Sequence, residues 1–500
     1  MKFPEVGLCF LLALGCGKDG QGQGGNSAVG EQGSKQKISP PTLLWKFEGT
    51  GFSSAPAVGE NGWVYGVEWG GVGHKPLLAV DSQTGVQKWK KEFGLNFGSP
   101  SIGPKGLVHV QVYQYESFLD GKTGKEKDEE FGAYISYSER SSYSSPAVAT
   151  DGTVYFGTTF GPDSGSVVAL KLENGAIVEK WNTSVGSVRS GLAIGRDGTV
   201  YTASYGTGFL YALHGGTGEI IWKTQIANTV RWHASPAIGA DGTIYIGSNK
   251  GKVYAFGAAD GAKKWTFTTE GNVFHTPCIA SDGTVIIGVD EKIYALNGAT
   301  GTKKWEFSPG GKVASSCVIG SDQIVYAGFS SARYEGGSKL YGLNEKDGSM
   351  AWELKMPQKF FSPGIMAPHV NPLTMGPDGT LYVGFGAYKT SSKGPAKSPW
   401  PMAGQNPQNT RRVPDAKAPV FPSLGKKLTW TARVDAKSID RVYLGKKRAV
   451  VKQVFGDPDK EQNGWWGFDG MKITAANGDK YSIVWFGFAD DTVQQVRFDK

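Results

Sequence analysis

Six side chains that could bind an anion precede Asp-Gly turns along this chain. They are Arg189, Arg231, Trp232, His233, His275 and His369. If the strands before these turns converge on a common axis, the six would form a basic funnel mouth for an anionic ligand or for a loop of a partner protein. Polar residues are also common in loops simply because loops are solvated, and that reading stays open.

Motifs of catalysis are missing from the sequence. The six histidines form no H-E-x-x-H pair, and no Walker, G-x-S-x-G or C-x-x-C-H motif occurs. We therefore expect no catalytic residue and no set of metal ligands. Cys278 and Cys317 fall in corresponding strands of neighbouring repeats. Small buried thiols are favoured there over a bridge, which an oxidising compartment would permit.

The first sixteen residues have the features of an export signal. Lys2 precedes a short apolar run, and Gly15 stands before Cys16. This resembles a lipoprotein signal, which implies that Cys16 becomes the lipid-carrying N-terminus; a plain cleaved signal is the alternative. Gly17, rather than an aspartate, follows the cysteine, and by the same resemblance this points to the outer membrane. Residues 17–40 lack apolar periodicity and are predicted to be a flexible tether.

The elements that must position these residues come from a repeat. The chain has 500 residues, of which 73 are glycine and 15 are tryptophan. Eight turns recur at intervals typical of a propeller or solenoid. They are centred on Asn61-Gly62, Lys105-Gly106, Asp151-Gly152, Asp197-Gly198, Asp241-Gly242, Asp282-Gly283, Asp322 and Asp378-Gly379. Each is predicted to be a two-residue turn within a blade of four antiparallel strands.

One tryptophan per repeat follows a second turn at a nearly constant distance. These residues are predicted to pack between neighbouring blades: Trp45, Trp89, Trp181, Trp222, Trp265, Trp305 and Trp352. In the third unit Asp128 takes the expected tryptophan position, so that contact should be weaker or filled differently.

Ring closure can be predicted from the strands that are missing. The eighth unit lacks an outer strand. Residues 386–399 stand where its third strand should be, and they are not expected to form that strand. An orphan strand around Trp45 is predicted to supply the outer strand and to remove the open edge. The fold class is thus an all-β, eight-bladed propeller over residues 41–410 with a small C-terminal α+β domain.

The repeat, with its D-G-T-V-Y, L-Y-A-L and T-G-K-x-W segments, resembles the pyrroloquinoline-quinone-like repeats. That family includes quinone-dependent dehydrogenases, which bind the quinone (PQQ) and calcium, and non-enzymatic propellers of outer-membrane assembly. The dehydrogenases have a vicinal cysteine pair and long insertions, and this chain has neither. The resemblance therefore favours a protein without a cofactor, with PQQ and calcium expected only under the enzymatic alternative.

A basic stretch follows the repeats. Between Lys389 and Lys452 there are fifteen Lys or Arg residues against three Asp, which exceeds the net charge of +8 for the whole chain. This stretch either contacts anionic headgroups or is a solvated linker. Residues 411–432 read as a basic, Pro-rich linker. The preceding W-P-M-A-G-Q-N-P-Q-N-T segment is similar to one that flanks such propellers, and its first part is expected to dock onto the eighth blade.

Residues 433–500 are predicted to form a helix followed by a small sheet. The run Leu444, Gly445, Val451, Phe455, Gly456 and Pro458, followed by Trp465, resembles the small outer-membrane lipoprotein A (SmpA/OmlA) family. That resemblance implies a module that stabilises the β-barrel assembly machinery and touches anionic lipid.

These patterns together favour a non-enzymatic scaffold that faces the periplasm, is held at the outer membrane and binds envelope or barrel-assembly proteins; a soluble periplasmic or secreted protein is the alternative location. Nucleic acid is not an expected partner. Two other functions stay open. One is a quinone-dependent oxidoreductase, and the other is a carbohydrate-binding propeller that uses Trp63, Trp69 and Trp232 as stacking platforms.

Overall fold

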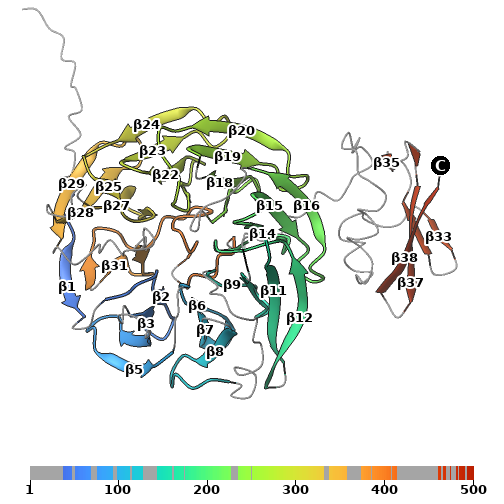
Figure 1. Ribbon diagram of the computed structural model, residues 1–500, viewed down its shortest axis with the longest axis horizontal. Helices are drawn as coiled ribbons and strands as arrows, with labels where there is room; N and C mark the ends of the chain where they lie inside the picture. Colours follow the sequence, from blue (N-terminus) through green and yellow to red (C-terminus); the bar gives the residue numbers. More distant parts are fainter. Residues whose placement is uncertain are drawn as a thin grey trace, which may run out of the picture. The chain divides into compact units, whose positions relative to one another are not determined.

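The computed structural model (Figure 1) describes most of the repeat region and a separate C-terminal sheet. The described residues are 38–47, 51–68, 76–93, 98–112, 115–127, 144–159, 161, 163–173, 175–226, 235–248, 250–330, 337–356, 373–384, 386–406, 408–413, 460–462, 465–468, 473–474, 480–481, 483–489 and 492–499. The predicted signal with Cys16, the tether up to residue 37 and the predicted helix around Val451 lie outside them.

Eight antiparallel sheets among the described residues form the blades of a propeller, arranged as a ring in Figure 1. Blades one to four contain β2 (Ala57–Val58), β3 (Trp63–Val67), β4 (Leu77–Asp81) and β5 (Gln87–Lys91); β6 (Ser101–Ile102), the 3-10 turn η1 (Pro104–Gly106), β7 (Leu107–Val112) and β8 (Tyr115–Asp120); β9 (Ala147–Val148), β10 (Val154–Gly157), β11 (Ser166–Glu173) and β12 (Ala176–Ser184); and β13 (Ala193–Ile194), β14 (Val200–Ala203), β15 (Phe209–Leu213) and β16 (Ile220–Gln225).

Blades five to eight follow the same order of strands. They contain β17 (Ala237–Ile238), β18 (Ile244–Ser248), β19 (Lys252–Phe256) and β20 (Lys263–Thr268); β21 (Cys278–Ile279), β22 (Val285–Val289), β23 (Lys292–Leu296) and β24 (Lys303–Phe307); β25 (Lys312–Val313), β26 (Val318–Ile319), β27 (Ile324–Ser330), β28 (Ser338–Asn344) and β29 (Met350–Met356); and β30 (Thr374–Met375), β31 (Thr380–Val383), β32 (Gly386–Lys389) and β1 (Thr42–Lys46). The predicted count of eight blades is confirmed.

Burial along a blade explains why these segments form strands. The second strand is apolar on both faces, as in β18, where all five residues are buried between neighbouring blades. The fourth strand alternates, and in β20 only Trp265 is buried among exposed and half-exposed neighbours. Strands that are apolar throughout therefore lie in the core of the blade, whereas the strand with alternating apolar and polar residues lies at the rim.

The hairpin between the first two strands differs from the predicted two-residue turn. Residues 239–243 separate β17 from β18, because the first strand ends after two residues. Asp241 still organises the loop, since its carboxylate accepts hydrogen bonds from the Thr243 amide at 2.9 Å and the Thr243 hydroxyl at 2.6 Å. Gly242 has a φ of 82°, a conformation that glycine adopts without a Cβ clash.

Blade eight closes the ring as predicted. The N-terminal strand β1 pairs antiparallel with β32, with Thr42 opposite Lys389 and Lys46 opposite Gly386. The expectation that residues 386–399 would not supply a third strand was wrong, because Gly386–Lys389 form β32 and pair with β31 on its other side. Only residues 390–399 leave the blade, so a single strand from the other end of the chain completes it.

Blade two is the least complete blade. Its described sheet has three strands, β6, β7 and β8, and the start of a fourth is marked by an isolated bridge between Leu119 and Glu126. Asp128, which takes the tryptophan position of the repeat, lies outside the described residues.

The C-terminal strands form a separate small sheet. Its order is β33 (Lys460–Gln462), β34 (Trp465–Phe468), β37 (Ile483–Ala489) and β38 (Thr492–Asp499), all antiparallel, and a hairpin pairs β35 (Ile473–Thr474) with β36 (Lys480–Tyr481). Across the described residues no helix has the length and apolar character needed to span a bilayer.

Candidate binding site at the propeller hub

The first strands of the blades surround the propeller axis, and a later segment of the chain is hydrogen-bonded to several of them. Residues 400–413, of which 407 lies outside the described set, follow blade eight and run among these strands; we call them the hub segment. They belong to the orange trace inside the ring in Figure 1. Met402, in the first part of this segment, packs in one cluster with Met375 and Leu381 of blade eight, whereas the backbone hydrogen bonds of the segment go to other blades.

Backbone hydrogen bonds hold the hub segment against five blades. The inner-strand amides that donate to its carbonyl oxygens belong to Ile102, Val148, Ile194, Ile279 and Ile319, at 2.8–3.0 Å. The innermost strand of a propeller blade would otherwise present these amides as an unpaired edge, and an unpaired buried amide is costly. The hub segment therefore acts as an additional partner strand for several blades at once.

Asn409 fixes the register of the hub segment. Its side-chain amide donates to the carbonyl oxygens of Ala55, Pro56 and Pro100 at 3.1–3.2 Å. The Ser101 hydroxyl donates to the Asn409 carbonyl oxygen at 2.8 Å. An amide donor aimed at three carbonyls permits one placement of the segment against blades one and two, so a slide along the axis would break all of these bonds.

Apolar side chains of the hub segment are also buried. Trp400 is fully buried and packs in the largest core cluster, whereas Met402 joins the cluster of blades seven and eight. These residues contribute about 1.5–3 kcal/mol each through removal of apolar surface from water.

Arg411 enters the wall of blade four where a side chain is missing. Ser99, Ser145 and Ser235 each accept a hydrogen bond from a backbone amide of the preceding blade, and Gly191 takes the equivalent position in blade four. A Cβ at Gly191 would lie 2.3 Å from Nη1 of Arg411. Burial lowers the pKa of Arg411 to about 10, so the guanidinium stays charged at neutral pH. The glycine thus makes room for a cation that the hub segment supplies.

The predicted funnel mouth is only partly within the described residues. Arg189 lies in the loop before the first strand of blade four, and its guanidinium sits 4.4 Å from the centre of the Tyr205 ring. His275 is 4 % exposed and its Nε2 lies 3.3 Å from the Val313 carbonyl oxygen. Burial lowers the pKa of His275 to about 4, so this side chain is neutral at pH 7 and adds no positive charge. Arg231, Trp232, His233 and His369 lie outside the described residues.

The two cysteines are free and buried, as expected, with Cys278 in the inner strand β21 of blade six and Cys317 directly before the inner strand β26 of blade seven. The Cys278 thiol donates to the Cys317 carbonyl oxygen at 2.6 Å. Burial raises the pKa of both thiols, which keeps them in the unreactive protonated form. Trp63, one of the three candidate stacking platforms, is half-buried with the Lys88 amine 5.8 Å from its ring centre; Trp69 and Trp232 are outside the described set.

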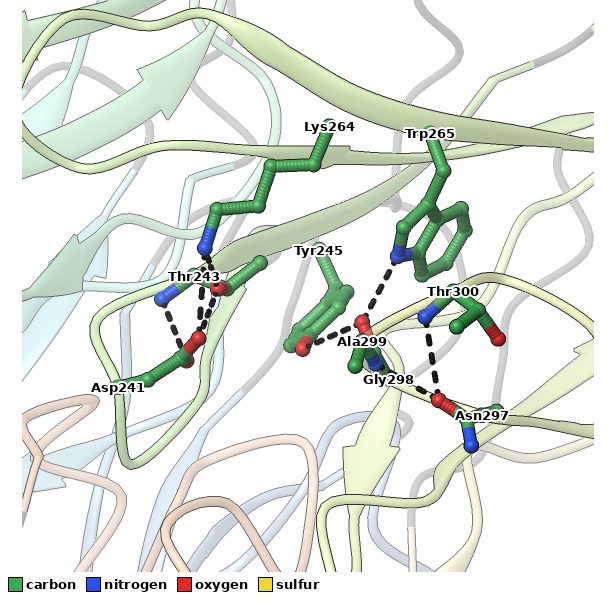
Figure 2. Close-up of polar contacts among 9 residues, drawn as sticks. All are labelled: Asp241, Thr243, Tyr245, Lys264, Trp265, Asn297, Gly298, Ala299 and Thr300. Atoms are coloured by element: carbon green, nitrogen blue, oxygen red, sulfur yellow. Dashed lines mark hydrogen bonds and ion pairs between the residues drawn. The ribbon is translucent and has the colours of Figure 1, made fainter.

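The tryptophans of the outer strands join each blade to the next one (Figure 2). Trp265 donates through Nε1 to the Gly298 carbonyl oxygen at 2.7 Å, and the Tyr245 hydroxyl donates to the same oxygen at 3.1 Å. A Cβ at Gly301 would lie 2.6 Å from the indole, so this turn needs glycine both for its φ of 75° and for ring contact. Equivalent indole bonds to the following blade, at 2.8–3.0 Å, are made by Trp45, Trp89, Trp181, Trp222 and Trp305.

Trp352 is the exception among the seven. Its Nε1 has no hydrogen-bond partner in the described part of the chain. The next blade is blade eight, whose third and fourth strands come from opposite ends of the repeat region. No turn joins those two strands, so the carbonyl oxygen that accepts the other indoles does not exist there.

Sequence reasoning missed the hub segment, although one signal was available. The W-P-M-A-G-Q-N-P-Q-N-T stretch was recognised as a propeller-flanking segment, but its partners are backbone amides spread over more than 200 residues. The reason for a glycine at position 191 becomes clear only in the structure, where the Arg411 side chain packs against it.

Fold and hub together define a class, the eight-bladed propellers built from pyrroloquinoline-quinone-like repeats. A family model described as "Outer membrane protein assembly factor BamB" matches residues 30–209 and 206–362, and the chain belongs to this family. Outer membrane protein assembly factor BamB of Yersinia pestis is 33% identical over 119 residues, which is 21% of this chain and 30% of that relative. The chain therefore matches under a third of the length of this relative.

Solved structures of very different proteins share this fold. A computationally designed protein, Ika8, aligns with a TM-score of 0.53 at 14% identity over 69% of this chain and 98% of its own. The quinohemoprotein alcohol dehydrogenase ADHIIG from Pseudomonas putida HK5 aligns with a TM-score of 0.52 at 14% identity over 69% and 72%. At such identities the likeness concerns the fold alone, and the site must decide between functions.

Proposed function

We propose that this chain is a non-catalytic scaffold of the outer-membrane assembly class, which faces the periplasm and binds envelope or barrel-assembly proteins through its propeller loops. The observation that carries the proposal is the occupied hub. Residues 400–413 of the chain are hydrogen-bonded to the inner strands of five blades, which makes the centre of the ring rigid. The family to which the chain belongs supports the same function.

The blade-to-blade contacts also suit a scaffold. Indole and tyrosine hydroxyl bonds repeat around the ring, and the ring has no open edge at its closure. A rigid ring presents its loops at fixed positions, which lowers the conformational cost of binding a partner. Cys16 would hold this ring at the membrane through its lipid, with residues 17–40 as the tether.

Affinity isolation from native membranes tests the proposal. The tagged full chain is crosslinked in cells and its partners are identified by mass spectrometry. We expect barrel-assembly or other envelope proteins to be recovered, and a Cys16→Ser variant to leave the membrane fraction and to lose most of them. Recovery of no envelope protein above an untagged control would contradict the proposal.

The quinoprotein alternative has its own measurement. Purified chain is incubated with pyrroloquinoline quinone and calcium, and bound chromophore and dye-linked alcohol oxidation are recorded. The scaffold function predicts neither signal, and a stoichiometric chromophore with turnover would replace it by an oxidoreductase.

A further inference from the structure

The first hairpin of blade two departs from the repeat in a way that places a cation at a cavity. In blades three, four, five, six and eight an aspartate caps this hairpin by accepting a hydrogen bond from the amide two residues later, at 2.9–3.0 Å. Blade two has Lys105 instead, with a φ of 61°. The left-handed region is strained for a lysine, and such local strain is commonly kept where a side chain has a function.

Lys105 lines a cavity of about 750 Å³. Turns of blades one, two and three form its walls, and the hub segment forms one side through Asn406, Gln408, Thr410 and Arg412. We call it the blade 1–3 cavity. Its volume lies within the range of about 300–1,000 Å³ that is usual for small-ligand sites.

Positive charge dominates the blade 1–3 cavity. Lys105, Lys122 and Arg412 line it, and no ion pair involving them is found among the described residues. Of the two carboxylates in the lining, Asp120 is already bound to Lys127 at 2.8 Å, and this lysine lowers the pKa of Asp120. Glu60 is then the remaining carboxylate against three cations. A concave surface with this excess concentrates anions.

Neutral amides complete the lining. The side chains of Asn61 and Asn406 are already hydrogen-bonded to Tyr65, Trp63 and Thr410. Each of these two amide nitrogens keeps a second N–H, which together with the Gln408 amide can pair with the backbone groups of a peptide. Arg412 can form paired hydrogen bonds with a carboxylate, and the two lysines add point charges. Lys105 and Lys122 are exposed and Arg412 is half-buried, so that an acidic segment can reach these cations from solvent.

We propose that the blade 1–3 cavity binds a short acidic peptide segment of a partner protein, with its carboxylates held by Lys105, Lys122 and Arg412. That the peptide belongs to a partner protein rests on the proposed scaffold function. The binding of carboxylates by the three cations does not depend on that function. Four turns from three blades and the hub segment contribute to the cavity, so that an intact hub is needed to build it.

Fluorescence anisotropy with the purified full chain tests this assignment. The probes are a labelled peptide of alternating Asp and Glu and the matched peptide of Asn and Gln. We expect saturable binding of the acidic peptide alone. Loss of one charge–carboxylate contact should weaken binding about tenfold in each of Lys105→Asn, Lys122→Gln and Arg412→Gln. Lys250→Gln, an exposed lysine in the loop between β18 and β19, is the matched control and should leave affinity unchanged.

Lys105→Asn separates binding from folding. Asparagine tolerates the left-handed conformation better than lysine, so this variant should unfold at the same temperature or higher while its affinity falls. Equal affinity in all four variants would overturn the assignment. Binding of phosphatidylglycerol vesicles or inorganic phosphate with the same dependence on the three cations, without binding of the peptide, would also overturn it.

The two proposals can fail separately. If crosslinking recovers envelope proteins but the acidic peptide does not bind, the cavity assignment is wrong and the scaffold function stands. If the peptide binds and crosslinking recovers no envelope protein, the cavity is a peptide site in a protein of another function.

Discussion

A hydrogen bond from one indole to the next blade is the smallest repeated unit of this structure. Trp265 and Trp352 occupy the same position in their blades and are similarly buried, yet only Trp265 has an acceptor, the Gly298 carbonyl oxygen. This pair therefore separates the contribution of the hydrogen bond from the contribution of ring burial.

Trp265→Phe and Trp352→Phe should differ in their effect on stability. Both remove similar apolar area, but Trp265→Phe also removes a bond worth about 1 kcal/mol net. We expect the free energy of unfolding in urea to fall further for Trp265→Phe by about this amount. Equal losses in the two variants would mean that the indole bond contributes nothing to blade docking.

Gly191 is the residue on which entry of Arg411 into the wall depends. Gly191→Ala would place a methyl group 2.3 Å from Nη1 of Arg411. We expect this overpacking to cost about 1–3 kcal/mol in thermal unfolding experiments. Gly161→Ala is the matched control, since a Cβ there meets nothing within 4 Å. A Gly191→Ala variant as stable as the control would show that Arg411 does not occupy the place of the missing side chain.

At the scale of elements, blade two carries an unusual buried acid. Glu116 in β8 is 1 % exposed, and neither of its carboxyl oxygens has a hydrogen-bond partner among the described residues. Burial raises the pKa of Glu116 well above its ordinary value.

The sign of this pH dependence follows from proton binding. Above the unfolded pKa near 4.5 the unfolded chain releases a proton that the folded chain retains, so folding becomes less favourable as pH rises. Glu116→Gln should therefore stabilise the protein at pH 8 and have a much smaller effect at pH 4.5. Thermal unfolding at the two pH values measures the difference, and a gain independent of pH would contradict a buried neutral carboxyl.

The elements also show what sequence patterns can and cannot predict. Turns such as Asp241-Gly242 and the outer-strand tryptophans recur locally, so the blades and their order follow from the sequence, and the orphan strand at Trp45 revealed the closure. The short strand β32 was missed because four residues next to a Ser/Lys-rich stretch give little periodicity. The contacts of the hub segment with the other blades were not predicted, because they are backbone hydrogen bonds. Such bonds require no particular side chains and therefore produce no recognisable sequence pattern.

At the scale of the whole propeller, the candidate site was predicted less well than the fold. The funnel mouth was inferred from residue types near a common turn, and of its described members His275 is buried and neutral whereas Arg189 stacks on Tyr205. Burial depends on packing between blades, which one repeat does not encode. The blade 1–3 cavity was missed for the same reason, since Lys122 and Arg412 are distant in sequence. The sequence identified Lys105 only as a residue of the repeated turn and gave no sign that it lines a cavity.

The whole ring is best understood as a scaffold built around its own chain. Indole hydrogen bonds join neighbouring blades at the rim, and residues 400–413 join several blades near the axis. The blades are therefore held together at both their outer and their inner strands. Under the proposed function, partners bind at the loops and in the blade 1–3 cavity. The functional account therefore depends on the hub segment being in place in solution.

Hydrogen–deuterium exchange of the purified full chain tests that dependence most directly. We predict that peptides covering residues 400–413 and the inner strands that contain Ile194 and Ile279 exchange as slowly as β18, because their amides and carbonyls pair with each other. Exchange of residues 400–413 within seconds, together with rapid exchange of the inner-strand amides, would show an open hub and would contradict the account.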